Sequence, residues 1–169
     1  MHESESDRTE LQQTIGASNA AAGPFLRSSF EIPELTLSAS QLINRLDGSV
    51  TLALGTVTSD GRPRVAPVIA LFYRGSFYIP SVSNALRTRH IRNNPAVSLS
   101  LYEGNDFAVI VHGNAKIVSS DDPTFDDLVK LQIEHANSDV REWGDPVYLR
   151  IDAERLYSFA RYPERFPAK

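Results

Sequence analysis

The residues from Ser81 to Pro95, SVSNALRTRHIRNNP, place three arginines and a histidine after a start that contains two serines. The chain as a whole is mildly acidic, with 17 Lys+Arg against 21 Asp+Glu, so this basic cluster does not follow from composition. Serine hydroxyl groups and the N–H groups that begin a helix donate hydrogen bonds to anions, and arginine binds phosphate through two donors at once. The pattern predicts a site for a negatively charged group, with Ser81 and Ser83 at its start.

The arginines of this stretch are not equivalent if it forms a helix. At about 100° per residue, Arg87 and Ile91 lie within about 40° of each other, whereas Arg89 and Arg92 project from nearly the opposite side. We expect Leu86 and Ile91 to face the interior, which places Arg87 at the buried boundary, where an arginine requires an anionic partner. Arg89 and Arg92 are expected to be solvated, and the alternative for Arg87 is the same solvated basic face.

The segment from Arg64 to Tyr73, RVAPVIALFY, is typical of a strand that is apolar on both faces. Such a strand is covered on both sides, which predicts the wall of a closed barrel that also carries a dimer contact. Pro67 removes one N–H donor from it. This indicates an edge, a bulge or a place where another group takes that position.

The rest of the pattern is mostly β, with turn residues at Ser59-Asp60-Gly61 and Arg74-Gly75 that suit tight hairpins. The expected strands are 50–58, 64–73, 76–80, 96–102, 107–120 and 146–160, the last with a bend at 152–154. Helices are expected near 38–47, over about 85–93 and over about 123–135. We therefore predict a mainly β protein, a β-barrel with helices, because a parallel α/β sheet would alternate strands with crossover helices.

Residues 1–30 are polar and lack sustained periodicity, which predicts a disordered N-terminal tail before a single domain at 31–169. A short helix from Thr9 to Ile15 is compatible with the spacing of Leu11 and Ile15. The start of the chain has no signal-peptide pattern, and no apolar run approaches a membrane span. With no cysteine in the chain, we expect a cytoplasmic protein.

Several chemistries lack their usual residues here. The formal net charge of -4 argues against broad nucleic-acid binding, and we expect no membrane partner. The four histidines, at 2, 90, 112 and 135, have no ligand spacing, so no metal site is expected, and His112 is expected in the core. No nucleophile elbow, Walker loop or dinucleotide-binding glycine motif occurs, which leaves hydrolase, NTPase and Rossmann functions without support.

In the order LALGTVTSDGRPRVAPV, FYIPSVSNALRTRHIRNNPAVSL and AVIVHGNAKIV, the chain resembles the pyridoxamine 5′-phosphate oxidase-like, FMN-binding split-barrel family. The resemblance covers 37–158 without the helix after Pro123. Its most specific parts are the Thr58–Pro63 hairpin and the basic helix that ends in Asn-Pro. It implies a six-stranded antiparallel split β-barrel of the FMN-binding type, as a homodimer with the cofactor at the subunit interface. A large branch of the family binds a deazaflavin, coenzyme F-420, instead.

The resemblance also implies roles for single residues. Arg87 matches the basic residue that holds the flavin phosphate, Ser81 matches a hydroxyl on the same group, and Arg64 is a second phosphate or ribityl candidate. Where many relatives have further polar or basic residues, this chain has Ala85 and Leu86. The wall beneath the flavin ring would come from Val65, Ala66, Pro67 and Val68, for which ordinary core packing is the alternative.

By analogy with family members, Trp143, Arg161 and Tyr162 are candidates for the substrate side, and packing as loop anchors is the alternative. The expected function is that of an FMN-dependent oxidoreductase that passes hydride between the flavin and a small organic substrate. The alternatives are a deazaflavin-dependent reductase and a non-catalytic protein that binds flavin or haem.

Overall fold

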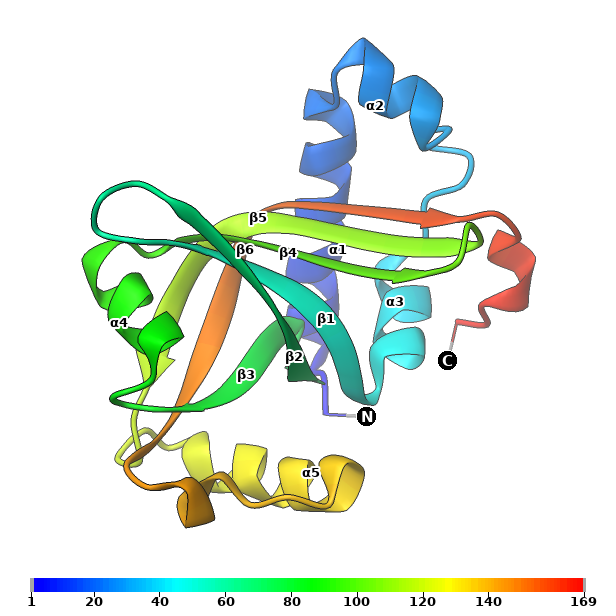
Figure 1. Cartoon of the computed structure of the whole chain (residues 1–169). Coiled ribbons are helices and arrows are strands. Elements are labelled where there is room, and N and C mark those ends of the chain that lie inside the picture. Colours follow the sequence, from blue (N-terminus) through cyan, green and yellow to red (C-terminus); the bar gives the residue numbers. More distant parts are fainter. Residues whose placement is uncertain (1, 169) are drawn as a thin grey trace.

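Six antiparallel strands form a closed barrel in the computed structural model, which describes residues 2–168 (Figure 1). Around the barrel the strands follow the order β1-β2-β3-β6-β5-β4. Their bounds are β1 Gly48–Val57, β2 Pro63–Tyr73, β3 Ser76–Val82, β4 Ala96–Glu103, β5 Phe107–Val118 and β6 Pro146–Ala160. This architecture confirms the six-stranded antiparallel barrel expected from the sequence. Of the two predicted ranges, 1–30 and 31–169, only residue 1 of the first and residue 169 of the second lie outside the described residues.

Helices cover the barrel from several sides. They are α1 Glu5–Ala21, α2 Pro24–Ser29, α3 Ala39–Leu46, α4 Leu86–Asn93 and α5 Phe125–Ala136, with short 3₁₀ turns η1 Val140–Trp143 and η2 Pro163–Arg165. The three expected helices correspond to α3, α4 and α5. Within residues 2–168, no helix has the length and apolar character needed to cross a membrane.

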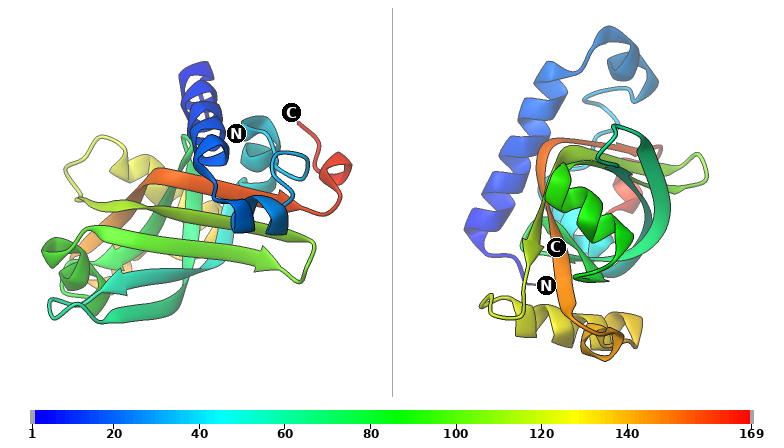
Figure 2. Two further views of the ribbon diagram at one scale, coloured as in Figure 1. Left: turned by 90° about the horizontal axis from the view of Figure 1, so that it is seen from above. Right: turned by 60° about the vertical axis from the view of Figure 1, so that its left-hand side comes forward.

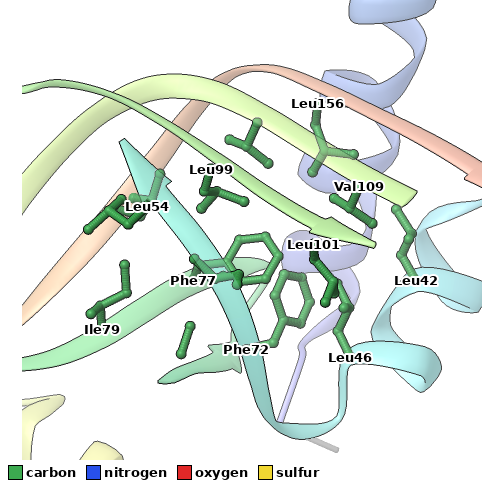
Figure 3. Close-up of a cluster of buried hydrophobic side chains, with 14 of the residues drawn as sticks. Leu42, Leu46, Leu54, Phe72, Phe77, Ile79, Leu99, Leu101, Val109 and Leu156 are labelled. Atoms are coloured by element: carbon green, nitrogen blue, oxygen red, sulfur yellow. The ribbon is translucent and has the colours of Figure 1, made fainter. Parts of the chain in front are cut away.

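The barrel interior is filled by alternate residues of each strand (Figure 3). Leu54 of β1 pairs in register with Leu99 of β4, and both side chains are buried. Phe72 and Phe77 meet edge to face with ring centroids 5.0 Å apart. The same period-2 alternation that is visible in the sequence therefore builds the core.

The barrel is split, because β2 and β3 pair over a short distance only. Their register runs from Leu71 to Tyr73 on β2, while the residues from 63 to 70 pair with β1 alone. Pro67 lies in this one-sided segment, where a missing N–H is tolerated. Of the three explanations for the proline, an edge is the one that the structure supports.

The N-terminal segment differs from the expected disordered tail. Residues 5–21 form α1, which begins at a capping box between Ser4 and Asp7 and packs along β6 (Figure 2). Its buried side chains are Leu11, Ile15 and Ser18. The sequence pattern for this helix is weak, because only these three of its 17 residues are buried and only two of the three are apolar.

A buried hydrogen bond explains why α1 docks where it does. Beyond Ile151, β6 has no β3 partner, so its outward N–H groups require other acceptors. The Leu156 N–H donates to the Ser18 hydroxyl oxygen at 2.9 Å, and the Ala160 N–H donates to the Leu35 carbonyl oxygen at 2.9 Å. The N-terminal segment therefore completes the open edge of the barrel.

The bend expected in the last strand is present as a β-bulge. His112 of β5 is in register with Arg155 of β6, whereas Gly113 is in register with Ala153, so Glu154 is the extra residue. At this point the two backbones approach closely enough that only a glycine fits at position 113.

Candidate functional site

A cavity of about 260 Å³ lies at the open edge of β2, beneath the β1–β2 hairpin and beside α4. Figure 2 shows α4 across this end of the barrel. We call this cavity the basic pocket. Its lining residues are Leu54, Thr56, Arg64, Val65, Ala66, Val68, Leu86, Arg87 and His90. Five of the predicted site residues therefore meet in one place, namely Arg64, Val65, Ala66, Val68 and Arg87.

Two guanidinium groups give the basic pocket its charge. Within residues 2–168, neither Arg64 nor Arg87 forms an ion pair, and the one hydrogen bond of Arg64 goes to the carbonyl oxygen of its neighbour Pro63 at 3.0 Å. Among the described residues, no carboxylate lines the pocket. Arg87 is half-buried and Arg64 is exposed, so both guanidinium groups can donate to an anion at the pocket.

The positive field of Arg64 also reaches the hairpin. The pKa of Asp60 is lowered, chiefly because the Thr58 hydroxyl donates to its carboxylate and to a smaller extent because Arg64 is near. The Asp60 carboxylate itself pairs with Arg62 at 2.9 Å. Asp60 is therefore paired with Arg62 within the hairpin and forms no ion pair with Arg64.

The start of α4 adds backbone donors to the pocket. Ala85 is the N-cap and offers no side-chain acceptor to the first-turn N–H groups. Leu86 and Arg87, which line the pocket, are the first two residues of this eight-residue helix. Uncapped N–H groups at a helix start favour an anion beside Arg87.

The predicted difference between the faces of α4 is correct for Arg87 and Arg89 but not for Leu86. Arg87 is half-buried and Arg89 is exposed, as expected. Leu86 is 58% exposed, because it begins the helix at the rim of the pocket. Thr88 turns inward instead. Arg92 is not simply solvated, since its guanidinium donates to the Ser83 carbonyl oxygen at 2.7 Å.

Ser81, Ser83 and Pro67 do not line the basic pocket. The Thr88 hydroxyl donates to the Val82 carbonyl oxygen at 2.9 Å, so the bond of 3.0 Å between Ser81 and Thr88 has Ser81 as its donor. Ser81 is 4% exposed and fastens β3 to α4. The Ser83 hydroxyl accepts from Arg92 at 2.6 Å. Both serines support the helix that carries Arg87.

Thr56 and His90 line the basic pocket but are not among the site residues predicted from the sequence. Their side chains share a hydrogen bond of 3.0 Å between Thr56 Oγ1 and His90 Nδ1, and both residues are buried. The spacing of His90 three residues after Arg87 was the available signal, because residues three apart share a helix face.

The expected core position of His112 is wrong. His112 is exposed on the outer face of β5, where its Nδ1 atom and the Ser98 hydroxyl are 2.8 Å apart. Val109 and Val111 fill the barrel interior, so the alternation along β5 turns His112 to the opposite face.

The three substrate-side candidates lie at opposite ends of β6. Trp143 precedes this fifteen-residue strand, whereas Arg161 and Tyr162 follow it. A strand rises by about 3.3 Å per residue, so one protomer does not bring the two groups together. Arg161 pairs with Asp106 at 3.2 Å, and the Arg165 guanidinium lies 4.1 Å from the Tyr162 ring centroid. These contacts favour the alternative of loop anchors for Arg161 and Tyr162.

Comparison with known proteins agrees with this arrangement. The family model described as pyridoxamine 5′-phosphate oxidase matches residues 41–160. No curated protein matches the chain. Among solved structures, the conserved hypothetical protein Rv2991 from Mycobacterium tuberculosis superposes with a TM-score of 0.66 at 20% identity, over 81% of this chain and 93% of that one.

Two further solved structures share the fold and differ in what their names state. An F420 reductase has a TM-score of 0.53 at 22% identity, over 66% of this chain and 91% of that one. HutZ, the haem storage protein from Vibrio cholerae, has a TM-score of 0.57 at 18% identity, over 72% of this chain and 89% of that one. The match over 41–160, together with the split barrel, shows that this chain belongs to the pyridoxamine 5′-phosphate oxidase family.

Proposed function

We propose that this protein is an FMN-dependent oxidoreductase that binds the flavin in the basic pocket. One observation carries the proposal: Arg64 and Arg87 line an otherwise largely apolar pocket and form no ion pair within residues 2–168. FMN combines a phosphate with a flat, largely apolar ring system. Arg87 and the first turn of α4 suit the phosphate, and Arg64 suits the phosphate or the ribityl chain.

The residues of the pocket fit such a cofactor in polarity. Leu54, Ala66 and Val68 offer an apolar floor against which a ring can lie. At about 260 Å³ the pocket is slightly smaller than the roughly 300–1,000 Å³ of complete ligand sites. Val65 and Ile69 stand exposed beside it, at 72% and 46%.

A second copy of the chain would complete the site and cover this apolar edge. The exposed Val65 and Ile69 belong to the strand whose apolar outer face predicts a dimer contact. The protein is accordingly proposed to act as a homodimer with the cofactor between subunits and to act on a small organic molecule.

The chemistry would be divided between cofactor and protein. A bound flavin supplies hydride transfer. The residues of this chain would bind the phosphate through Arg87, orient the ring against β2 and keep water from its buried side. No residue of the pocket is assigned as a nucleophile, because hydride transfer to or from a flavin requires none.

The deazaflavin coenzyme F-420 is the alternative cofactor, which the similarity to an F420 reductase supports. A haem-binding role is the alternative that the similarity to HutZ supports. The three cofactors differ in visible absorption, so the spectrum of the purified protein separates them.

The test is a titration of FMN, F-420 and haem into the protein and into two single-arginine variants. Arg87→Ala is expected to weaken FMN binding by about 1.5–3 kcal/mol, the usual contribution of a hydrogen bond to a charged group. Arg89→Ala is the matched control, because Arg89 is exposed on the same helix and does not line the pocket. Equal losses, or binding of F-420 or haem in place of FMN, would contradict the proposal.

A further inference from the structure

A second cleft, of about 410 Å³, lies at the opposite end of β2 from the basic pocket. α1 forms one wall, and the β2–β3 turn with β6 forms the other. We call it the α1 cleft. In this turn Arg74 and Gly75 both have positive φ, of 50° and 74°, and Gly75 lies against the backbone of α1 at Asp7. The proposed flavin chemistry uses none of its residues.

One of the residues that line the α1 cleft is a tyrosine, Tyr78. Tyr78 lines the cleft, its side chain is 3% exposed, and no residue from 2 to 168 forms a hydrogen bond with its hydroxyl. Burial raises the pKa of Tyr78, so the hydroxyl keeps its proton and remains a donor. The ring of Tyr78 is buried, whereas its hydroxyl is accessible and offers a donor to a ligand in the cleft.

The two walls of the α1 cleft carry opposite charges. On the barrel side, Arg74 forms no ion pair within residues 2–168 and its guanidinium lies 5.5 Å from the Tyr73 ring centroid. On the helix side, Asp7 and Glu10 form no ion pair with any described residue; their oxygens accept from the Ser4 N–H and the Ser6 hydroxyl. Residues of both charges thus line one cleft of ligand size, with Arg74 and Glu10 exposed at it.

Other lining groups limit what the cleft can hold. Arg150 is paired with Asp152 at 2.9 Å, and Asp152 also pairs with Lys116 at 2.6 Å, so this acid is neutralised within the barrel wall. Leu11 of α1 contributes apolar surface between the charged walls. A simple anion would meet the acids of α1, and a simple cation would meet Arg74. A molecule with both charges satisfies both walls.

We propose that the α1 cleft binds a free α-amino acid in its zwitterionic form. The ligand carboxylate accepts hydrogen bonds from the Tyr78 hydroxyl and from Arg74. The ligand ammonium group faces Asp7 and Glu10, and the ligand side chain lies along Leu11. The cleft is a site separate from the flavin site, because it lies at the other end of β2.

The test compares probes that differ only in their charged groups. Isothermal titration and thermal-shift measurements on the full chain use L-leucine and L-glutamine, each beside its C-terminal amide, which lacks the carboxylate, and its N-acetyl form, which lacks the ammonium group. We expect binding of the free amino acids and at least about tenfold weaker binding of both derivatives, since each derivative loses one charge-assisted interaction. Equal binding of all three forms, or no binding of either amino acid at millimolar concentration, overturns the proposal.

Variants show whether binding occurs in the α1 cleft. Tyr78→Phe keeps the buried ring, and Arg74→Gln and Glu10→Gln keep the side-chain shape. Each is expected to weaken amino-acid binding about tenfold or more. Arg89→Gln is the matched control for Arg74→Gln and is expected to leave amino-acid binding unchanged. Arg87→Ala alters the basic pocket and is also expected to leave amino-acid binding unchanged, because the two sites are separate. Amino-acid binding that none of the three cleft variants weakens contradicts the assignment, and melting temperatures report whether each variant is folded.

Discussion

Thr56 Oγ1 of β1 and His90 Nδ1 of α4 lie 3.0 Å apart, and this buried hydrogen bond joins the helix that carries Arg87 to the barrel wall. A second buried hydrogen bond, between the side chains of Ser81 and Thr88, joins the same helix to β3. The two bonds hold α4 across the end of the barrel. The position of Arg87 in the basic pocket therefore depends on side chains other than its own.

Thr56→Val tests this support, because valine keeps the shape of threonine and removes the hydroxyl. We expect the free energy of unfolding to fall by about 1–3 kcal/mol, since His90 Nδ1 loses its partner in a buried place. Thr51→Val is the matched control, at an exposed position of the same strand, with an expected change within about 0.5 kcal/mol. Urea unfolding measures both, and equal effects would show that the bond does not support α4.

Ser18→Ala tests whether α1 is held by the open edge of β6. The Leu156 N–H would lose its acceptor, which is expected to cost about 1–3 kcal/mol of stability. Amide hydrogen exchange is the specific readout, because protection of the Leu156 amide should fall more than that of its neighbours. Gln13→Ala truncates an exposed side chain of the same helix and should leave that protection unchanged. A Leu156 amide that stays fully protected in Ser18→Ala would contradict this role.

Gly113→Ala and Gly16→Ala are predicted to have opposite effects. A Cβ atom on Gly113 would lie 2.1 Å from the Asp152 carbonyl oxygen, so the bulge between β5 and β6 must shift. We expect a loss of about 3 kcal/mol or more. Gly16 lies in α1 with nothing within 4 Å of a Cβ, and alanine there should stabilise by about 0.5–1 kcal/mol. Thermal unfolding measures both, and a Gly113→Ala protein as stable as the parent would contradict the close approach.

Stability is predicted to fall in alkali through Tyr148. Burial raises the pKa of Tyr148, whose hydroxyl donates to Gln132 Oε1 at 2.6 Å. Below the ordinary tyrosine pKa of about 10 both states keep the proton; above it the unfolded chain loses the proton first, so unfolding becomes more favourable as pH rises. A tyrosine of this kind makes the free energy of unfolding fall more steeply with pH, by up to about 1.4 kcal/mol per pH unit.

The Tyr148→Phe variant isolates this effect. Its unfolding free energy should be lower at neutral pH, because Gln132 loses a donor, but should decline less steeply above about pH 10. Tyr162→Phe, at a 38% exposed residue, should leave the slope unchanged. Urea unfolding at a series of alkaline pH values measures the slopes. The same slope in Tyr148→Phe and in the parent would rule out Tyr148 as its source.

Local pattern was sufficient for the barrel strands and for one residue of the site. Runs of strand-forming residues between turn residues predict the strands, but the run from 64 to 73 is apolar on both faces and does not show which face points inward. The helical projection likewise separates Arg87 from Arg89, since this depends on helix geometry alone. The outward position of Leu86 was missed because the first residue of a helix can lie at a rim.

What the sequence determined by itself is the period of each element, its turns and the side of α4 that carries Arg87. Tertiary structure alone decided that α1 is ordered, because its reason for docking is a free N–H group at Leu156, 138 residues from Ser18. It also decided that Thr56 meets His90 and that Ser81 supports the helix instead of lining the pocket. Local pattern reports how a segment buries its own apolar side chains. Which polar group satisfies which distant partner depends on how the closed barrel brings its edges together.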